Sequence, residues 1–325
     1  MKAEAATLTG AIPLPSTVES TPSRFAAFLE LTKPRLTMLV LLTVAAGYVA
    51  GARRASNPAV VLWTVLGAGL VAAGASAWNQ VLERKRDARM RRTASRPIPT
   101  GIVTPVEGAI FGTVMAIVGC VLLAATSRPI AAVVAASTFL LYVLIYTPLK
   151  PRTTLNTAIG AIPGALPPVI GWSAATGRLG IEATALFLIL FLWQFPHFLA
   201  IAWIYRVDYR RGGHKMLPSV DPDGSITSRQ AFWYALALVP VGLLPTVVGL
   251  AGPFYFAGAF VVGLFYLVAA TRFMTTTNDA SARRLLWSSF LYLPAVLALL
   301  LANPTPDVRI AALPAIDRVV AADSP

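Results

Sequence analysis

Three side chains that carry oxygen ligands stand four residues apart at the end of a long apolar stretch. Asn79, Glu83 and Asp87 have the spacing i, i+4 and i+8, and on an α-helix each such step turns only about 40° around the axis. The three side chains therefore share one helix face, where amide and carboxylate oxygens could hold Mg²⁺. A solvated helix end with i,i+4 charge partners explains the same spacing, so spacing alone leaves both interpretations open.

A second polar segment, residues 205–218, places one carboxylate, Asp208, among several cations that include Lys215. Carboxylates can hold a metal ion while Lys and Arg neutralise the remaining charge of a phosphate group. Together the two segments suit a Mg²⁺-bridged diphosphate. The sequence contains no glycine-rich P-loop, the other common phosphate site.

The elements that position these segments are predicted to be membrane helices, because the chain is very apolar. Of its 325 residues 56% are hydrophobic and only 13% are charged, with a mean hydropathy of +0.68, and a soluble domain needs more charge to cover its surface. The net charge of +13 could suggest nucleic acid, but basic residues in a membrane protein usually mark cytoplasmic loops, so we expect no nucleic-acid partner.

With one cysteine, Cys120, and two histidines, neither an intrachain disulfide nor a His/Cys metal cluster can form.

Apolar runs bounded by Pro, Gly and charge predict nine membrane-spanning helices. The fifth is the least regular, because glycines and prolines interrupt it between Gly160 and Pro168. These spans form one intramembrane domain, residues 24–303, between a disordered N-terminal tail, residues 1–23, which lacks the apolar core of a signal peptide, and a C-terminal tail, residues 304–325. The predicted spans are 36–52, 59–82, 106–126, 129–147, 154–175, 182–205, 230–250, 254–271 and 284–302.

Lysines and arginines gather in the N-terminal segment and in every second loop. By the positive-inside rule this side is cytoplasmic. We therefore expect a multi-pass protein of the cell (inner) membrane, with its N-terminus in the cytoplasm and its C-terminus on the opposite side. The opposite side holds only Arg53, Arg54, Arg128, Arg178, Arg309 and Arg318.

The first polar segment and its surroundings resemble a known family. Asn79-Gln80-x-x-Glu83-x-x-x-Asp87 is similar to the first acidic motif of the UbiA-type intramembrane prenyltransferases. The continuation Arg92-Thr93-x-x-Arg96-Pro97 resembles one branch of that family, the protohaem IX farnesyltransferases (haem O synthases). The match covers about residues 31–220 and continues through Thr32-Lys33-Pro34-Arg35, Tyr146-Thr147-x-x-Lys150-x-Arg152-Thr153, Gly164-Ala165-x-Pro167-Pro168-x-Ile170-Gly171-Trp172, Trp193-Gln194-x-Pro196-His197-Phe198, Asp208-Tyr209 and Met216-Leu217-Pro218.

The resemblance implies an all-α membrane protein whose nine transmembrane helices form a UbiA-like ring around a central cavity. It implies a reaction in which the farnesyl group of farnesyl diphosphate is joined to a vinyl group of haem B in the bilayer. Water completes the hydroxyethylfarnesyl substituent of haem O, and diphosphate leaves. Mg²⁺ would be the cofactor, and proteins of haem A formation or terminal-oxidase assembly would be further partners. The implied catalytic and metal-binding residues are Asn79, Glu83, Asp87 and Asp208, and the implied diphosphate contacts are Lys150, Arg152, Lys215, Arg91, Arg92 and Arg96.

Two positions depart from the pattern of the wider family. Glu83 stands where many members have Asp, although the longer carboxylate can still reach Mg²⁺. The position four residues after Asp208 is Gly212. The second acidic region therefore offers one carboxylate, with Tyr209 as a candidate helper, and the number of metal ions stays open.

His197 is a further candidate functional residue, because its imidazole can bind a metal or a proton. It follows Pro196 inside the sixth predicted span, and an ionisable residue inside the membrane is functional by default. It could contact haem iron, since neutral imidazole is a common haem ligand. It could equally satisfy the carbonyl that Pro196 leaves without a donor. The sequence leaves both roles open.

Two other functions compete with haem farnesylation. The nearest is the same prenyl transfer to another acceptor, an aromatic acid or a quinone precursor. A more distant one is a transporter or channel whose basic loops are only topology signals. The transporter hypothesis predicts that replacing Asp87 or Asp208 leaves diphosphate binding unchanged.

Overall fold

The structure, a computed structural model, describes residues 23–52 and 57–305. Within these ranges nine helices are long and apolar enough to cross a membrane, the number predicted. The tails expected at residues 1–23 and 304–325 lie outside the described ranges, apart from Ser23, Pro304 and Thr305. The spans are Pro34–Ala52, Pro58–Asp87, Pro105–Thr126, Pro129–Leu149, Asn156–Thr176, Ile181–Ile204, Ser225–Val247, Pro253–Thr276 and Asp279–Ala302.

Six of these spans consist of one helix each, and three are divided. The unbroken helices are α2 (Pro34–Ala52), α3 (Pro58–Asp87), α4 (Pro105–Thr126), α9 (Ile181–Ile204), α14 (Pro253–Thr276) and α15 (Asp279–Ala302). The fourth span comprises α5 (Pro129–Leu140), the π-helix η2 (Leu141–Tyr146) and α6 (Thr147–Leu149); the fifth comprises α7 (Asn156–Ala165) and α8 (Pro167–Thr176); the seventh comprises α12 (Ser225–Gly242) and α13 (Leu244–Val247).

Local sequence signals explain where several helices begin. Pro58 stands in the first turn of α3, where its missing N–H costs nothing, behind the cap Asn57. Thr104 and Glu107 close a capping box before α4. The fifth span breaks at Leu166, before the pair Pro167-Pro168, as its irregular sequence predicted.

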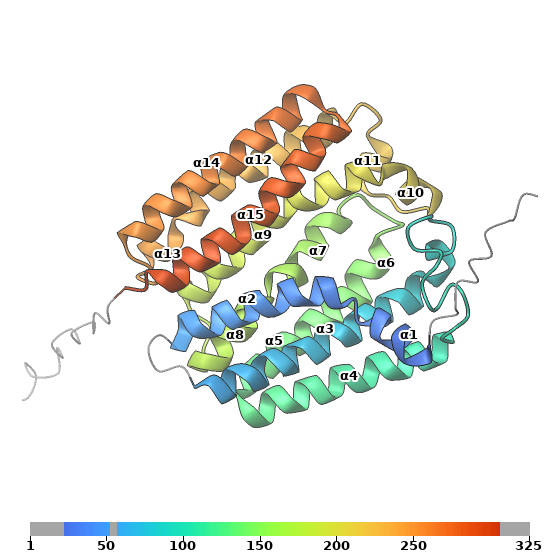
Figure 1. The fold of residues 1–325 in the computed structure, drawn as a ribbon, viewed down its shortest axis with the longest axis horizontal. Coiled ribbons are helices and arrows are strands. Elements are labelled where there is room, and N and C mark those ends of the chain that lie inside the picture. The colour runs from blue at the N-terminus through green and yellow to red at the C-terminus, as the bar shows by residue number, and fades with distance from the viewer. Residues whose placement is uncertain (1–22, 53–56, 306–325) are drawn as a thin grey trace, which may run out of the picture.

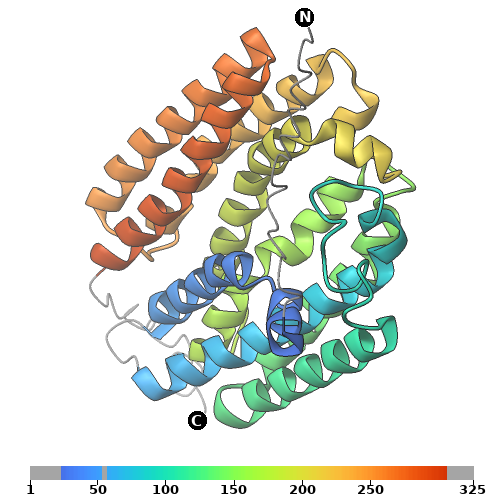
Figure 2. The same cartoon turned by 45° about the vertical axis from the view of Figure 1, so that its right-hand side comes forward.

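The spans form a ring, because successive spans pack side by side and α15 returns to contact both α9 and α2. Figures 1 and 2 show α12, α14 and α15 grouped on one side of the molecule and α3, α4 and α5 on the opposite side. The short helices α10 (Arg206–Arg211) and α11 (Leu217–Val220) and the turns after α3 lie together at one end of the bundle (Figure 1).

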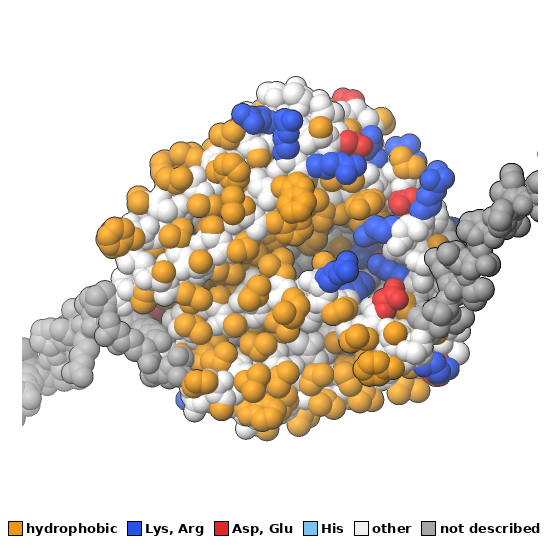
Figure 3. Space-filling model, viewed as in Figure 1, with side chains coloured by type: hydrophobic (Ala, Val, Ile, Leu, Met, Phe, Trp, Pro, Cys, Tyr) orange, Lys and Arg blue, Asp and Glu red, His pale blue; other side chains and the backbone are white. Residues whose placement is uncertain are grey.

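The face of the ring that Figure 3 shows is apolar over most of its height. Phe254, Trp287 and Val247 are each more than 70% exposed. In water such exposure would be costly, whereas acyl chains solvate it. The chain is therefore a multi-pass membrane protein.

The close packing of α2 against α8 depends on glycine. A Cβ on Gly171 would lie 1.9 Å from the carbonyl oxygen of Val44, and one on Gly47 would lie 2.1 Å from that of Pro168. Small residues at such crossings let helix backbones approach each other in a membrane. Gly171 belongs to the segment Gly164–Trp172, which resembles the family's sequence. Close helix packing explains why a glycine stands at this position.

Candidate active site

A cavity of about 230 Å³ opens inside the ring, near the end that carries α10 and α11. In Figure 3 the surface is hollowed at this place, with Lys and Arg side chains along the rim and apolar side chains on the other side. Its polar wall is formed mainly by α3, the segment before α2 and the loops after α3, α6 and α10. The polar and ionisable residues that line it are Lys33, Asn79, Glu83, Asp87, Arg92, Arg96, Tyr142, Tyr146, Lys150, Thr157, His197, Tyr209 and His214.

The last turns of α3 carry the three predicted oxygen ligands into this cavity. Asn79, Glu83 and Asp87 are 2%, 5% and 0% exposed, so they are not a solvated helix end. Because α3 continues unbroken to Asp87, all three lie on the helix face that spacing predicted, and each lines the cavity.

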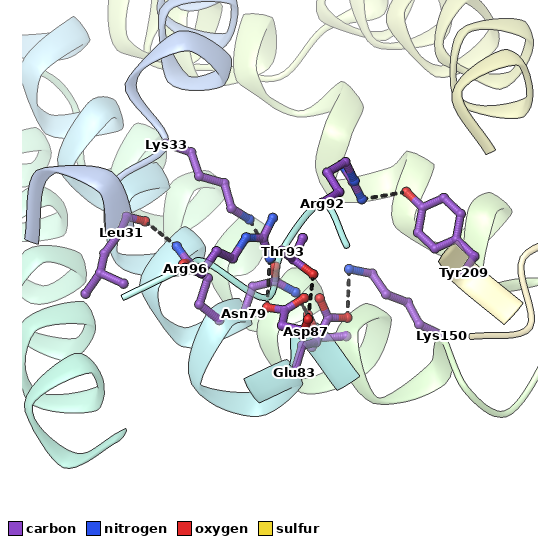
Figure 4. Close-up of polar contacts among 12 residues, drawn as sticks. Leu31, Lys33, Asn79, Glu83, Asp87, Arg92, Thr93, Arg96, Lys150 and Tyr209 are labelled. Carbon is purple, nitrogen blue, oxygen red and sulfur yellow. Dashed lines mark hydrogen bonds and ion pairs between the residues drawn. The ribbon is translucent and has the colours of Figure 1, made fainter. Parts of the chain in front are cut away.

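Asp87 forms an ion pair with the loop that follows its own helix. Nη1 of Arg96 donates to Oδ2 of Asp87 at 2.7 Å, and the Thr93 hydroxyl donates to the Asp87 carbonyl at 2.9 Å. The loop after α3 is thereby tied down over the end of the helix (Figure 4). The second carboxylate oxygen, Oδ1, is buried and has no hydrogen-bond partner within the described residues.

Lys150, just after α6, lies across the cavity from Arg96. Its Nζ lies 2.9 Å from Oε1 of Glu83 and 4.6 Å from the centre of the Tyr146 ring. Burial lowers the pKa of the Lys150 ammonium, but the Glu83 carboxylate and the tyrosines raise it by more, so that it lies above its usual value. Lys150 is therefore a permanent positive charge beside Glu83.

The π-helix η2 places two tyrosines on the cavity wall. A π-turn shifts the register of a helix by one residue and often marks a functional site. Here Tyr142 and Tyr146 both line the cavity, and the rings contact each other at 5.2 Å between centroids. The Thr147 hydroxyl donates to the Tyr142 carbonyl at 2.9 Å and accepts from Nδ2 of Asn79 at 3.2 Å, which fixes the orientation of the Asn79 amide.

Lys33 is a cavity residue for which the sequence suggested no role. Its Nζ donates to Oδ1 of Asn79 at 3.1 Å, and its backbone is left-handed, with φ of 49°. The turn between the short helix α1 (Arg24–Leu31), which was not predicted, and α2 requires this strained conformation, of a kind that clusters at functional sites. Burial lowers the pKa of the Lys33 ammonium to about 7, and Arg96 and Lys150 act in the same direction. An anion bound here would relieve that repulsion.

The segment around α10 contributes Tyr209 to the cavity but not Asp208. The Tyr209 hydroxyl accepts from Nη2 of Arg92 at 3.3 Å (Figure 4), and the Arg92 guanidinium also lies over the Tyr205 ring. Asp208 is half-buried, lies 3.8 Å from Arg211 and is not among the lining residues. No three His, Cys, Asp or Glu side chains in the described part of the chain are placed to hold one metal ion.

Three predicted phosphate contacts also lie off the cavity wall. The side chains of Arg91, Arg152 and Lys215 are exposed and do not line it. Lys215 acts through its backbone instead, since its N–H donates to the Lys150 carbonyl at 2.8 Å. Arg92, Arg96 and Lys150 are the predicted phosphate contacts that the structure brings to the cavity.

His214 is another cavity residue without a predicted role. It is 4% exposed, and its Nδ1 is buried without a hydrogen-bond partner among the residues described. Burial lowers the pKa of the His214 imidazole to about 4, so the ring is neutral at pH 7. The sequence signal that could have found it is its position between Asp208 and Met216, inside the second polar segment.

His197, on α9, lines the same cavity as the carboxylates. It is 7% exposed, and its Nδ1 lies 2.7 Å from the Ser289 hydroxyl of α15. Its neighbour Gln194 is structural, because Nε2 donates to the Ala161 carbonyl of α7 at 2.8 Å. That bond holds the broken fifth span against α9.

A ring of nine membrane helices with buried carboxylates, cations and an apolar cavity wall defines the class of intramembrane prenyltransferases. Residues 40–303 match the model of the UbiA prenyltransferase family, and the chain belongs to this family. It is an enzyme, a prenyltransferase.

Proteins of similar sequence carry a more specific name. The protoheme IX farnesyltransferase of Solibacter usitatus (strain Ellin6076) is 44% identical over 283 residues, which is 84% of this chain and 97% of that protein. The protein of the same name from Aquifex aeolicus (strain VF5) is 39% identical over 277 residues, 85% and 94% of the two chains.

Solved structures share the fold at much lower identity. A digeranylgeranylglyceryl phosphate synthase structure superposes with a TM-score of 0.72 at 17% identity, covering 86% of this chain and 98% of the other. A UbiA homologue from Archaeoglobus fulgidus, bound to DMAPP and Mg²⁺, gives a TM-score of 0.59 at 14% identity over 84% and 98%. These structures bear out the predicted nine-helix ring.

Proposed function

We propose that this protein is a protohaem IX farnesyltransferase, which transfers the farnesyl group of farnesyl diphosphate to a vinyl group of haem B. The observation that carries the proposal is a single cavity that presents a diphosphate-type site at one wall and His197 at another. Relatives with this name cover most of the chain. Haem B and farnesyl diphosphate are therefore the proposed substrates.

The charges in the cavity favour an anionic ligand. Lys33, Arg92, Arg96 and Lys150 face two carboxylates, Glu83 and Asp87, so positive charge is in excess. Arg92 is exposed, but Lys33, Arg96 and Lys150 are at least half-buried, and cations removed from water that repel one another are costly unless an anion pairs with them. A diphosphate placed among them would be bound, and the charge that develops as it leaves would meet cations fixed in advance.

The oxygen ligands on α3 fit Mg²⁺. Asn79, Glu83 and Asp87 present hard oxygen donors on one helix face, and Oδ1 of Asp87 is a buried acceptor with no partner in the described ranges. We assign these three residues to the metal. When bound, Mg²⁺ supplies Lewis-acid stabilisation of the diphosphate oxygens. Asp208 stands apart from this set, and we propose for it at most a contact to a second ion.

The apolar wall protects the allylic group from water. Phe198, Ile201 and Met216 line the cavity together with the polar residues. An allylic cation formed there would be captured prematurely if water entered freely, and the apolar side chains exclude it. The acceptor is held in the same space, which supplies proximity to the prenyl donor.

The proposed orientation places this cavity at the cytoplasmic side. The segments after α3, α6 and α9 lie at that end of the ring and carry 10 of the 27 lysines and arginines, and the last turn of α3 adds Arg84, Lys85 and Arg86. The positive-inside rule then gives a cytoplasmic N-terminus and a C-terminus on the opposite side of the cell (inner) membrane. The mouth would face cytoplasmic farnesyl diphosphate.

The direct test incubates the purified protein with haem B, farnesyl diphosphate and Mg²⁺ and measures product mass. A mass gain that corresponds to haem O is expected, and it should disappear when Mg²⁺ is chelated. Product with an aromatic acid or a quinone precursor, but none with haem B, would assign the protein to another acceptor. Proteins of haem A formation or terminal-oxidase assembly are the proposed downstream partners.

A further inference from the structure

The His197 ring is held from one side by a serine on another span. Its Nδ1 lies 2.7 Å from Oγ of Ser289, and Ser289, on α15, is fully buried. The Ser289 hydroxyl also lies 2.5 Å from the Leu286 carbonyl of its own helix. A carbonyl only accepts, so the single hydroxyl hydrogen is directed to Leu286.

This arrangement decides which ring nitrogen of His197 carries the proton. Because the Ser289 hydrogen is engaged, Oγ accepts, and Nδ1 of His197 must be the N–H that donates to it. The ring is buried among aromatic side chains and forms no ion pair with a carboxylate in the described part of the chain, so the site accommodates the neutral imidazole. In that tautomer Nε2 holds a free lone pair.

The ring cannot easily turn to exchange its two nitrogens. It stacks on Trp193 at 4.9 Å between ring centres, and the edges of Phe198 and Phe290 pack against it at 5.3 and 5.2 Å. The stacked Trp193 is itself fixed, since its Nε1 donates to the Ser289 carbonyl at 3.0 Å and its carbonyl accepts from the Tyr266 hydroxyl. His197 lines the cavity, and with Nδ1 held by Ser289 the nitrogen left for a ligand there is Nε2.

We propose that Nε2 of His197 is the axial ligand of the acceptor haem iron, and that Ser289 is the positioning residue that holds the imidazole in the iron-binding tautomer. This inference rests on the proposed haem substrate and goes beyond it by naming the ligand atom and its support. Histidines that bind metals commonly donate their other ring N–H to such a partner, which fixes ring orientation. Iron ligation would place the porphyrin edge in the cavity that holds the diphosphate site.

The chain offers a matched control for Ser289. Ser288 is also buried, at 4% exposure, and its hydroxyl donates to the Leu285 carbonyl at 2.7 Å. It therefore makes the same kind of helix contact without touching the imidazole. Ser288→Ala and Ser289→Ala remove the same atoms from adjacent positions of α15.

The test titrates haem B into the purified full-length protein and follows the Soret band. His197→Ala is expected to lose the ligand-induced Soret shift, and added imidazole should restore it. Ser289→Ala should weaken haem B binding about 10-fold, whereas Ser289→Thr and Ser288→Ala should stay near the wild type. Metal-free protoporphyrin IX, followed by fluorescence, should bind equally well to wild type and Ser289→Ala, because it has no iron to ligate.

Failure of the inference and failure of the proposed function give different results. If the wild type makes haem O but His197→Ala keeps the wild-type Soret spectrum, the ligand assignment is overturned and the farnesyltransferase proposal stands. Equal losses in Ser288→Ala and Ser289→Ala, or an equal loss of protoporphyrin IX binding, would reduce Ser289 to a packing role. If the wild type neither binds nor farnesylates haem B, both proposals are overturned.

Discussion

Arg96 occupies one oxygen of the Asp87 carboxylate and leaves the other one free. Nη1 of Arg96 donates to Oδ2 at 2.7 Å, whereas the buried Oδ1 has no hydrogen-bond partner among the residues described. A carboxylate held in this way keeps a fixed orientation and has one open acceptor. It is prepared to bind a cation without first losing a bond.

Replacing Asp87 should therefore remove metal-dependent function. Asp87→Asn keeps the size of the side chain but removes the negative charge. We expect prenyl transfer to fall about 100-fold or more, with a loss of the Mg²⁺ dependence of farnesyl diphosphate binding. Asp208→Asn is the matched comparison, since Asp208 does not line the cavity, and its effect should be at least about ten times smaller in the same assay. Equal effects would show that Asp208 belongs to the same metal site.

The Glu83–Lys150 pair predicts opposite responses to Mg²⁺ in two variants. Lys150→Met leaves the buried Glu83 charge unpaired and should destabilise the protein by about 3 kcal/mol. Mg²⁺ could then compensate that charge, so the Mg²⁺-induced rise in Tm should exceed that of the wild type. In Glu83→Gln the rise should shrink, because a ligand is lost. Thermal unfolding in detergent, with and without Mg²⁺, measures both, and a Tm response equal to wild type in both variants would contradict the assigned site.

Lys33 is predicted to bind the diphosphate from the segment before α2. Lys33→Met should weaken farnesyl diphosphate binding about 10-fold, the usual magnitude for a charge-assisted hydrogen bond. Arg35→Met changes the same charge two residues later, but Arg35 is exposed and does not line the cavity. Isothermal titration of both variants separates a local contact from a general loss of positive charge. Similar affinities for the two variants would remove Lys33 from the site.

The sequence was sufficient for the parts of this protein that depend on periodicity. Apolar runs predicted the nine spans, and the i, i+4, i+8 spacing predicted the shared face of α3. The break in the fifth span followed from its prolines. The ends were less accurate, because α3 stays helical past residue 82 to Asp87 and α12 begins at Ser225 rather than near 230. The first turn of α12 and the last turn of α3 are polar, so the hydropathy pattern does not show that these residues are helical.

Residues that reach the cavity through irregular backbone could not be predicted in the same way. Lys33 arrives there because of a left-handed turn after α1, and Tyr142 and Tyr146 share the wall because η2 shifts the helix register. His214 is buried by the fold of the loop after α10. Neither hydropathy nor spacing encodes such turns.

The proposed orientation can be tested with single cysteines. Cys120 is the only cysteine in the chain, so Cys120→Ala provides a clean background. We expect Arg178→Cys, in the exposed loop between α8 and α9, to react with a membrane-impermeant maleimide added outside intact cells. Arg91→Cys, in the loop after α3, should react only after the membrane is opened. The reverse pattern would invert the topology and place the cavity mouth outside.

Gly171 should be far more sensitive to substitution than glycines with room around them. An added Cβ would lie 1.9 Å from the Val44 carbonyl oxygen and 2.6 Å from the Tyr48 backbone nitrogen, and neither backbone atom can move without separating α2 from α8. Overpacking of this kind costs about 1–3 kcal/mol and occasionally more, so Gly171→Ala should lower Tm and the yield of folded protein.

Gly69→Ala is the control for that substitution. Its new methyl group would meet only the Leu41 side chain, at 3.1 Å, and a leucine side chain can shift by a few tenths of an ångström at little cost. The Tm of Gly69→Ala should stay close to that of the wild type.

Because α2 also carries Leu36, which lines the cavity beside Lys33, displacement of α2 in Gly171→Ala should weaken farnesyl diphosphate binding even in the fraction that folds. Wild-type binding by the folded Gly171→Ala protein would mean that the α2–α8 contact supports stability alone.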